Sequence, residues 1–115
     1  MPHFGYTLGA LVDHADHSRH VYKANLRPGD LLVVSTVNSR YSLRVLPDGT
    51  CSASGGWFDK KGVAPMNVRI AGCTWGGSTI KIDIAAACGL CLEFGNRVVT
   101  SPIQRIVIFP YSMQN

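Results

Sequence analysis

Hydrophobic residues occur along this chain in short runs, and glycine or proline separates most of these runs. In residues 40–46 apolar and polar positions alternate, so that Tyr41, Leu43 and Val45 share one side of an extended chain. A period of two predicts a β-strand with one buried face. Residues 31–37 are apolar on both sides instead, which predicts a strand that is buried on both faces.

Turn sequences connect the predicted strands. Pro28-Gly29 precedes the strand 31–37, and Asp48-Gly49 follows the strand 40–46. Gly95-Asn96, between apolar segments on either side, is typical of a two-residue hairpin loop. A last strand covers residues 103–109, directly after Pro102.

Four other segments have less regular patterns. Residues 4–12 are predicted to form the first strand, interrupted at Gly9. Residues 78–84 alternate, and we expect their three isoleucines on one face of a strand. The glycine-flanked residues 54–62 predict a long mobile loop, and residues 85–89 predict one helical turn that ends at a glycine.

These elements predict an all-β fold with about seven to nine short strands and at most one or two helical turns. A small antiparallel barrel and a two-sheet sandwich fit the pattern equally well. The 115 residues correspond to a single β domain over residues 1–115. A chain of this length buries enough apolar surface to fold without a disulfide or a metal ion.

Charge, the N-terminal sequence and the cysteine content indicate where in the cell the protein is expected. Eleven Lys and Arg residues against seven Asp and Glu residues give a net charge of +4 and a pI near 9.1. The N-terminal residues lack the pattern of a signal peptide, and no apolar run is long enough to cross a membrane, so we expect a cytoplasmic protein with no membrane partner. In a reducing cytosol the four cysteines are expected to be free thiols.

Basic and aromatic residues form the first candidate site. Arginines and one lysine occupy outward positions of predicted strands, and aromatic residues lie in the glycine-rich segments. Small barrels bind single-stranded nucleic acid with such residues, through backbone attraction and base stacking. The candidate nucleic-acid or ligand-binding residues are Arg40, Arg44, Trp57, Phe58, Lys60, Lys61, Arg69, Trp75, Lys81 and Arg97. The alternative is that these residues are the polar outer positions and core-covering aromatics of a β fold.

Histidines form the second candidate site. His14, His17 and His20 lie within seven residues and next to Asp13 and Asp16. Imidazole and carboxylate groups together suit zinc or another divalent metal. The spacing matches no established metal motif, so a solvated connector is the alternative and no cofactor is the first expectation.

Cys88 and Cys91 form a Cys-x-x-Cys pair. A redox-active pair of this kind belongs at the N-terminus of a helix, where the thiol pKa is lowered. The residues that follow Cys91 read as strand and turn, which argues against that role. As half of a zinc site, the pair would need two further ligands, and only Cys51 and Cys73 remain. We therefore expect the cysteines to act as small hydrophobic residues.

The sequence contains no nucleophile elbow and no phosphate-binding loop followed by a helix. The favoured interpretation is a small binding or assembly module without catalytic activity. Strands with two apolar faces favour self-association, so another copy of the same chain is one expected partner, in a homo-oligomer. The alternatives are a barrel that binds single-stranded nucleic acid and a metal-binding protein that uses the histidine cluster of residues 13–20.

Overall fold

The structure is a computed structural model that describes residues 16–75 and 79–114. The predicted strand 4–12 lies outside the described residues. The strands are β1 (Asp16–Ser18), β2 (His20–Tyr22), β3 (Leu31–Thr36), β4 (Arg40–Val45), β5 (Cys51–Gly55), β6 (Met66–Val68), β7 (Ile70–Thr74), β8 (Ile80–Lys81), β9 (Ile84–Ala87), β10 (Cys91–Phe94) and β11 (Val99–Phe109). The helices are the 3-10 turns η1 (Lys23–Asn25) and η2 (Tyr111–Met113) and the α-helix α2 (Gly56–Lys60).

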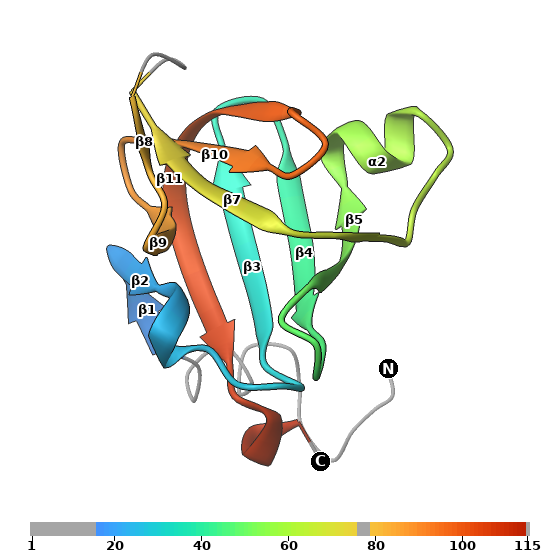
Figure 1. Cartoon of the computed structure of the whole chain (residues 1–115), viewed down its shortest axis with the longest axis vertical. Coiled ribbons are helices and arrows are strands. Elements are labelled where there is room, and N and C mark those ends of the chain that lie inside the picture. The colour runs from blue at the N-terminus through green and yellow to red at the C-terminus, as the bar shows by residue number, and fades with distance from the viewer. Residues whose placement is uncertain (1–15, 76–78, 115) are drawn as a thin grey trace.

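The prediction of an all-β fold is confirmed, and every strand pairing is antiparallel (Figure 1). One sheet has the order β6-β5-β4-β3-β11-β10-β7-β8, with β1 also paired to β11. Only Arg69 separates β6 from β7. The strand that pairs with β5 therefore continues as the strand that pairs with β10, and the pairing runs in a closed ring around the core.

The core lies inside this ring, as the alternation in β4 predicts. Tyr41, Leu43 and Val45 are buried, and the residues between them are at least partly exposed. In β3, Leu32 and Val34 point inward and are fully buried. The outer residues of β3 are only half-buried, so its second apolar face remains partly open to solvent.

A second, two-stranded sheet of β2 and β9 lies beside the ring (Figure 1). The prediction of a helical turn over residues 85–89 was wrong, because this segment contains most of β9. Ala85, Ala86 and Ala87 are completely buried there. Small side chains let this strand approach the core closely, and that packing outweighs the intrinsic helix preference of alanine.

The turns fix the ends of the ring strands. The Pro28-Gly29 turn is closed by a hydrogen bond of 3.0 Å from the Asp30 N–H to the Arg27 carbonyl. The β10–β11 hairpin is confirmed, but its turn is longer than two residues, because Glu93 pairs with Val99. Strand β11 then continues through Pro102 as one eleven-residue strand.

The prediction of a loop over residues 54–62 was also wrong, because α2 occupies its centre. The helix is short, and tertiary contacts hold it: Phe58 is completely buried, and the Trp57 N–H donates to the Tyr41 hydroxyl at 3.2 Å. No helix among the described residues is long and apolar enough to span a membrane.

Candidate functional site

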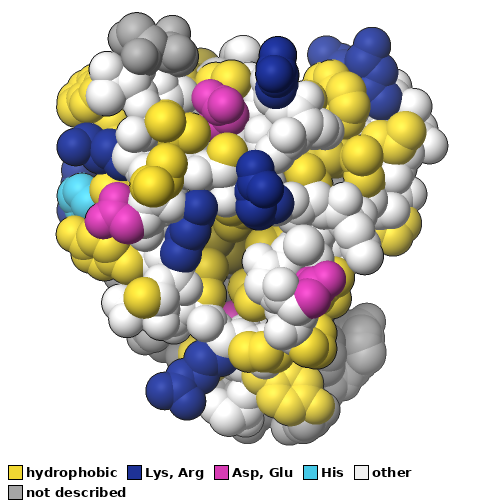
Figure 2. Space-filling view, viewed as in Figure 1, with side chains coloured by type: hydrophobic (Ala, Val, Ile, Leu, Met, Phe, Trp, Pro, Cys, Tyr) yellow, Lys and Arg dark blue, Asp and Glu magenta, His cyan; other side chains and the backbone are white. Residues whose placement is uncertain are grey.

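Exposed apolar side chains gather where β7, β8 and the β2–β9 sheet meet. Ile80 of β8 is paired with Thr74, the residue before Trp75. Ile82 follows β8, and Tyr22 pairs with Ile84. We call this group the corner surface and define it by Tyr22, Trp75, Ile80 and Ile82, with the cations Lys23, Arg69 and Lys81 beside them. In Figure 2 hydrophobic side chains lie on this part of the molecule next to Lys and Arg side chains.

The exposure of these side chains is unusual for apolar residues. Trp75 and Ile82 are each 67% exposed, Tyr22 is 47% exposed and Ile80 is 39% exposed. Scattered apolar residues on a surface need no explanation, but a group on neighbouring elements points to an interaction site. The corner surface is therefore the leading candidate for a binding site.

Gly72 allows β7 and β8 to lie close together. A Cβ atom at this position would be 2.4 Å from the Lys81 carbonyl oxygen, and the φ angle is +154°. Only glycine accommodates both this φ angle and this approach. The backbone of β8 is thus in direct contact with the backbone of β7, and the side chains of β8 are exposed at the surface.

Lys23 forms hydrogen bonds with both β7 and the turn that follows β8. Its backbone N–H donates to the Asp83 carbonyl at 3.0 Å, and its ammonium group donates to the Ala71 carbonyl at 3.0 Å. Burial and the nearby Arg69 guanidinium lower the pKa of Lys23, while the Asp83 carboxylate opposes this effect. Lys23 therefore has a structural role and also adds positive charge beside the corner surface.

Strand β8 is at the end of the sheet. Among the described strands only β7 pairs with it. The prediction that Ile80, Ile82 and Ile84 share one strand face was wrong: residues 82 and 83 form a turn, Ile82 is exposed and Ile84 is buried. This turn leaves β8 as a short edge strand with an apolar residue on either side of Lys81.

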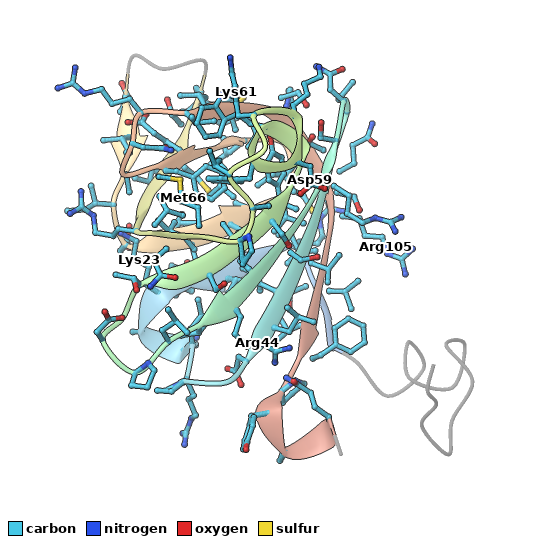
Figure 3. All side chains as sticks on the ribbon, turned by 90° about the vertical axis from the view of Figure 1, so that its right-hand side faces the viewer. Lys23, Arg44, Asp59, Lys61, Met66 and Arg105 are labelled. Carbon is cyan, nitrogen blue, oxygen red and sulfur yellow. The ribbon has the colours of Figure 1, made fainter. Side chains whose placement is uncertain are left out.

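The predicted nucleic-acid-binding residues come from several elements: β4, α2, β8 and the segments beside them. Arg44 lies on the outer side of β4, and its guanidinium donates to the Gly29 carbonyl at 2.9 Å and to the Gln114 amide oxygen. Of these candidates Figure 3 labels two: Lys61 lies near the top of the view and Arg44 lies toward the bottom. Arg40, Lys60, Arg69, Trp75, Lys81 and Arg97 are exposed. Of the ten candidates, the corner surface contains Arg69, Trp75 and Lys81.

Phe58 is not available for base stacking. It is completely buried, and its ring packs edge-on against Phe94 at 5.0 Å, Trp57 at 5.3 Å and Tyr41 at 6.1 Å between ring centroids. Trp57 is half-buried and packs against the core. This aromatic pair therefore closes one end of the core, and Phe58 has no place in a surface site.

The histidine hypothesis falls largely outside the described part of the chain. His14 is not among the described residues, the backbone of His17 lies in β1, and His20 is exposed in β2. Within residues 16–75 and 79–114, no three His, Cys, Asp or Glu side chains lie close enough together to hold a metal ion. The metal site of His14, His17 and His20 stays a hypothesis.

The four cysteines are free thiols. Burial raises the pKa of both Cys51 and Cys73 to about 11. Cys88 is partly exposed between β9 and β10, and its thiol contacts the Gln104 carbonyl at 3.6 Å. Cys91 starts a strand and not a helix, as the sequence predicts. Cys51 and Cys73 thus have the character expected of small hydrophobic residues.

A groove of about 670 Å³ lies between η1 and the end of β11. Its lining among the described residues includes Asp30, which is only 8% exposed. The Asp30 carboxylate accepts hydrogen bonds from the N–H groups of Arg27 at 2.9 Å and Tyr111 at 3.2 Å. Asp30 therefore fastens the turn before β3 to the segment after β11, which is a structural role.

Comparison of this chain with protein-family models, with curated proteins and with solved structures gives no match. The functional argument therefore rests on the residues themselves. Sequence reasoning included Trp75 and Lys81 but missed Tyr22, Ile80 and Ile82. The one signal for the exposed isoleucine was Asp83 within an apparent strand, because aspartate is depleted in strands and favoured in turns.

Proposed function

We propose that this protein is a binding or assembly module without catalytic activity, and that it binds a partner protein through the corner surface. The observation that carries the proposal is the combination of exposed Trp75, Ile80 and Ile82 with an edge of β8 that pairs with no other strand in residues 16–75 and 79–114. Tryptophan is among the residues that contribute most to protein–protein binding energy. An unpaired strand edge offers backbone hydrogen bonds to another chain.

The rest of the molecule supports a protein that works without large conformational change. The core is enclosed by a ring of paired strands. The corner surface is attached to this ring by the close contact at Gly72 and by the hydrogen bond from Lys23 to Ala71. A rigid mounting reduces the entropy lost on binding, so a small surface binds more tightly. The four free cysteines are compatible with a reducing compartment, and we propose a cytoplasmic location on that basis.

Nucleic acid is a less favourable partner. Two of the candidate basic residues, Lys61 and Arg44, lie toward opposite ends of the view in Figure 3. Phe58 is buried in the core. A single-strand binder needs a continuous basic groove and aromatic side chains that stack on successive bases. Among the candidate aromatic residues only Trp75 is well exposed, and Tyr22 is the other exposed aromatic residue of the corner surface.

A peptide selection tests the proposal. A library of displayed random peptides is selected against the wild-type protein and counter-selected against a Trp75→Ser/Ile82→Ser variant. Val37→Ser/Val63→Ser is the matched control, because these valines are also exposed, at 57% and 41%, but lie away from the corner surface. We expect selected peptides to bind the wild type and the control variant and to lose binding to the corner variant.

Two results would overturn the proposal. One is a selection that enriches no peptide. The other is a set of enriched peptides that bind the corner variant as well as the wild type. Circular dichroism and urea unfolding of both variants show whether either substitution pair disturbs the fold.

A further inference from the structure

We infer that the partner contributes an extended segment in which apolar and acidic side chains alternate, and that this segment adds to β8 as a further strand. The inference rests on the proposed function and identifies the chemistry of the partner. It is built from the edge of β8, from Lys81 on that edge, and from the isoleucines on either side of Lys81 in the sequence.

The edge of β8 fits an extended peptide. A strand that adds to a sheet gains backbone hydrogen bonds along the edge, and alternate side chains fall on the two sides of the sheet. Such a segment would meet Ile80, whose side chain lies over Gly72, and it would meet the exposed Ile82 in the turn that follows β8. Aliphatic side chains of the partner are the natural complement of these two isoleucines.

Lys81 argues against a second copy as the occupant. It is exposed, and it is half of a two-residue edge strand. Two copies joined edge to edge around a two-fold axis would bring Lys81 of one copy next to Lys81 of the other. Like charges on neighbouring strands are destabilising, and edge lysines are a common way of preventing self-pairing.

The same lysine favours a carboxylate on the incoming strand. Lys81 is exposed on the edge strand, so its ammonium group is accessible to an incoming chain. An acidic side chain placed near Lys81 would add a favourable cross-strand pair. The local charge thus complements an acidic segment and opposes a basic one.

The isoleucines distinguish a peptide from nucleic acid. A single-stranded nucleic acid is also anionic, but it binds through stacking on aromatic rings, and aliphatic side chains give no comparable contact. It also lacks the amide N–H and carbonyl pattern that pairs with a strand edge. Ile80, Ile82 and the edge of β8 together therefore favour a polypeptide.

Synthetic peptides test the inference directly. Three peptides are compared: alternating valine and glutamate, alternating valine and lysine, and the glutamate peptide with N-methyl groups on alternate backbone amides. Trp75 fluorescence is the readout, in a Trp57→Phe background that leaves one tryptophan. We expect the glutamate peptide to bind, and the lysine and N-methylated peptides to bind roughly tenfold more weakly or not at all.

A charge reversal provides the matched control. In Lys81→Glu the preference should invert, so that the lysine peptide binds more tightly than the glutamate peptide. Amide hydrogen exchange should show that residues 80–82 gain protection when the glutamate peptide is bound. Equal binding of both charges, an unaffected N-methylated peptide, tighter binding of an oligothymidylate, or a dimer of the wild type that dissociates in Ile82→Ser would each overturn the inference.

The inference and the proposed function fail in different ways. If the library selection yields corner-dependent peptides with no acidic bias, the proposed function stands and the inference is wrong. If the selection yields no corner-dependent peptide, the proposed function itself is wrong.

Discussion

The ammonium group of Lys23 donates a hydrogen bond of 3.0 Å to the carbonyl oxygen of Ala71, 48 positions later in the chain. The backbone N–H of the same residue donates to the Asp83 carbonyl. One residue thus connects β7 with the turn that follows β8. This link is one polar contact that, together with the pairing of β7 and β8, positions the corner surface relative to the core.

Lys23→Met should lower the free energy of unfolding by about 1 kcal/mol, because it keeps the aliphatic stem but leaves the Ala71 carbonyl without this donor. The measurement is urea unfolding at neutral pH. Lys60→Met is the control, since Lys60 is exposed in α2, and it should change stability by less than about 0.5 kcal/mol. Equal losses in the two variants would contradict the assigned role of Lys23.

Gly72→Ala should destabilise the protein by roughly 1–3 kcal/mol and weaken binding of corner-selected peptides. The added Cβ would lie 2.4 Å from the Lys81 carbonyl oxygen, so β8 has to move away from β7. Gly49→Ala is the matched control, because its φ angle is +87° but no atom lies within 4 Å of the added Cβ. It should lose stability from backbone strain alone and bind normally. A Gly72 variant that binds peptide as well as the Gly49 variant would argue against the close contact.

The aromatic residues Phe58 and Trp75 should respond in opposite ways to truncation. Phe58→Ala removes a completely buried ring and should cost about 3–5 kcal/mol of stability. Trp75→Ala changes a side chain that is 67% exposed and should stay within about 0.5 kcal/mol of the wild type. Thermal and urea unfolding provide both numbers. A severe loss in the Trp75 variant would mean that this residue serves the core and not a binding surface.

Alkaline pH should weaken the fold through the buried cysteines. In the folded protein the pKa of Cys51 and Cys73 is raised from 9.0 to about 11, so both thiols keep their protons over a range in which the unfolded chain releases them. The folded state therefore binds more protons between about pH 9 and pH 11, and its stability falls as the pH rises through this window.

Urea unfolding of the wild type and of a Cys51→Ala/Cys73→Ala variant across that window tests this expectation. The variant should have a shallower decline, because tyrosine and lysine titration is common to both proteins. At neutral pH a thiol reagent should modify the partly exposed Cys88 and Cys91 in the folded state and should reach the other two only after unfolding. Identical pH profiles would contradict the raised pKa values.

Much of the ring was predictable because its strands have one buried face. The alternation around Leu43 identified β4, and Gly95-Asn96 identified the β10–β11 hairpin. The helix α2 was not predictable, since its residues have weak helix preference and its stability comes from Phe58 in the core and from the Tyr41 hydroxyl. Such tertiary contacts leave no periodic signal in the local sequence.

The candidate site was only partly predictable for a related reason. Regular spacing placed Ile80, Ile82 and Ile84 on one face, and a buried strand was the natural interpretation. Whether an apolar residue is buried depends on what packs over it, and a turn at residues 82 and 83 separates the exposed Ile82 from the buried Ile84. Local hydrophobicity does not distinguish the two cases.

The ring of strands has one further consequence. Strands β7 and β10 pair directly with each other, so the ring is complete without β8, which is an excursion of the chain between them. The residues that display Ile80, Lys81 and Ile82 are thus separate from those that enclose the core. Substitution of this short segment would therefore change the binding preference of the protein without changing the strands that enclose the core.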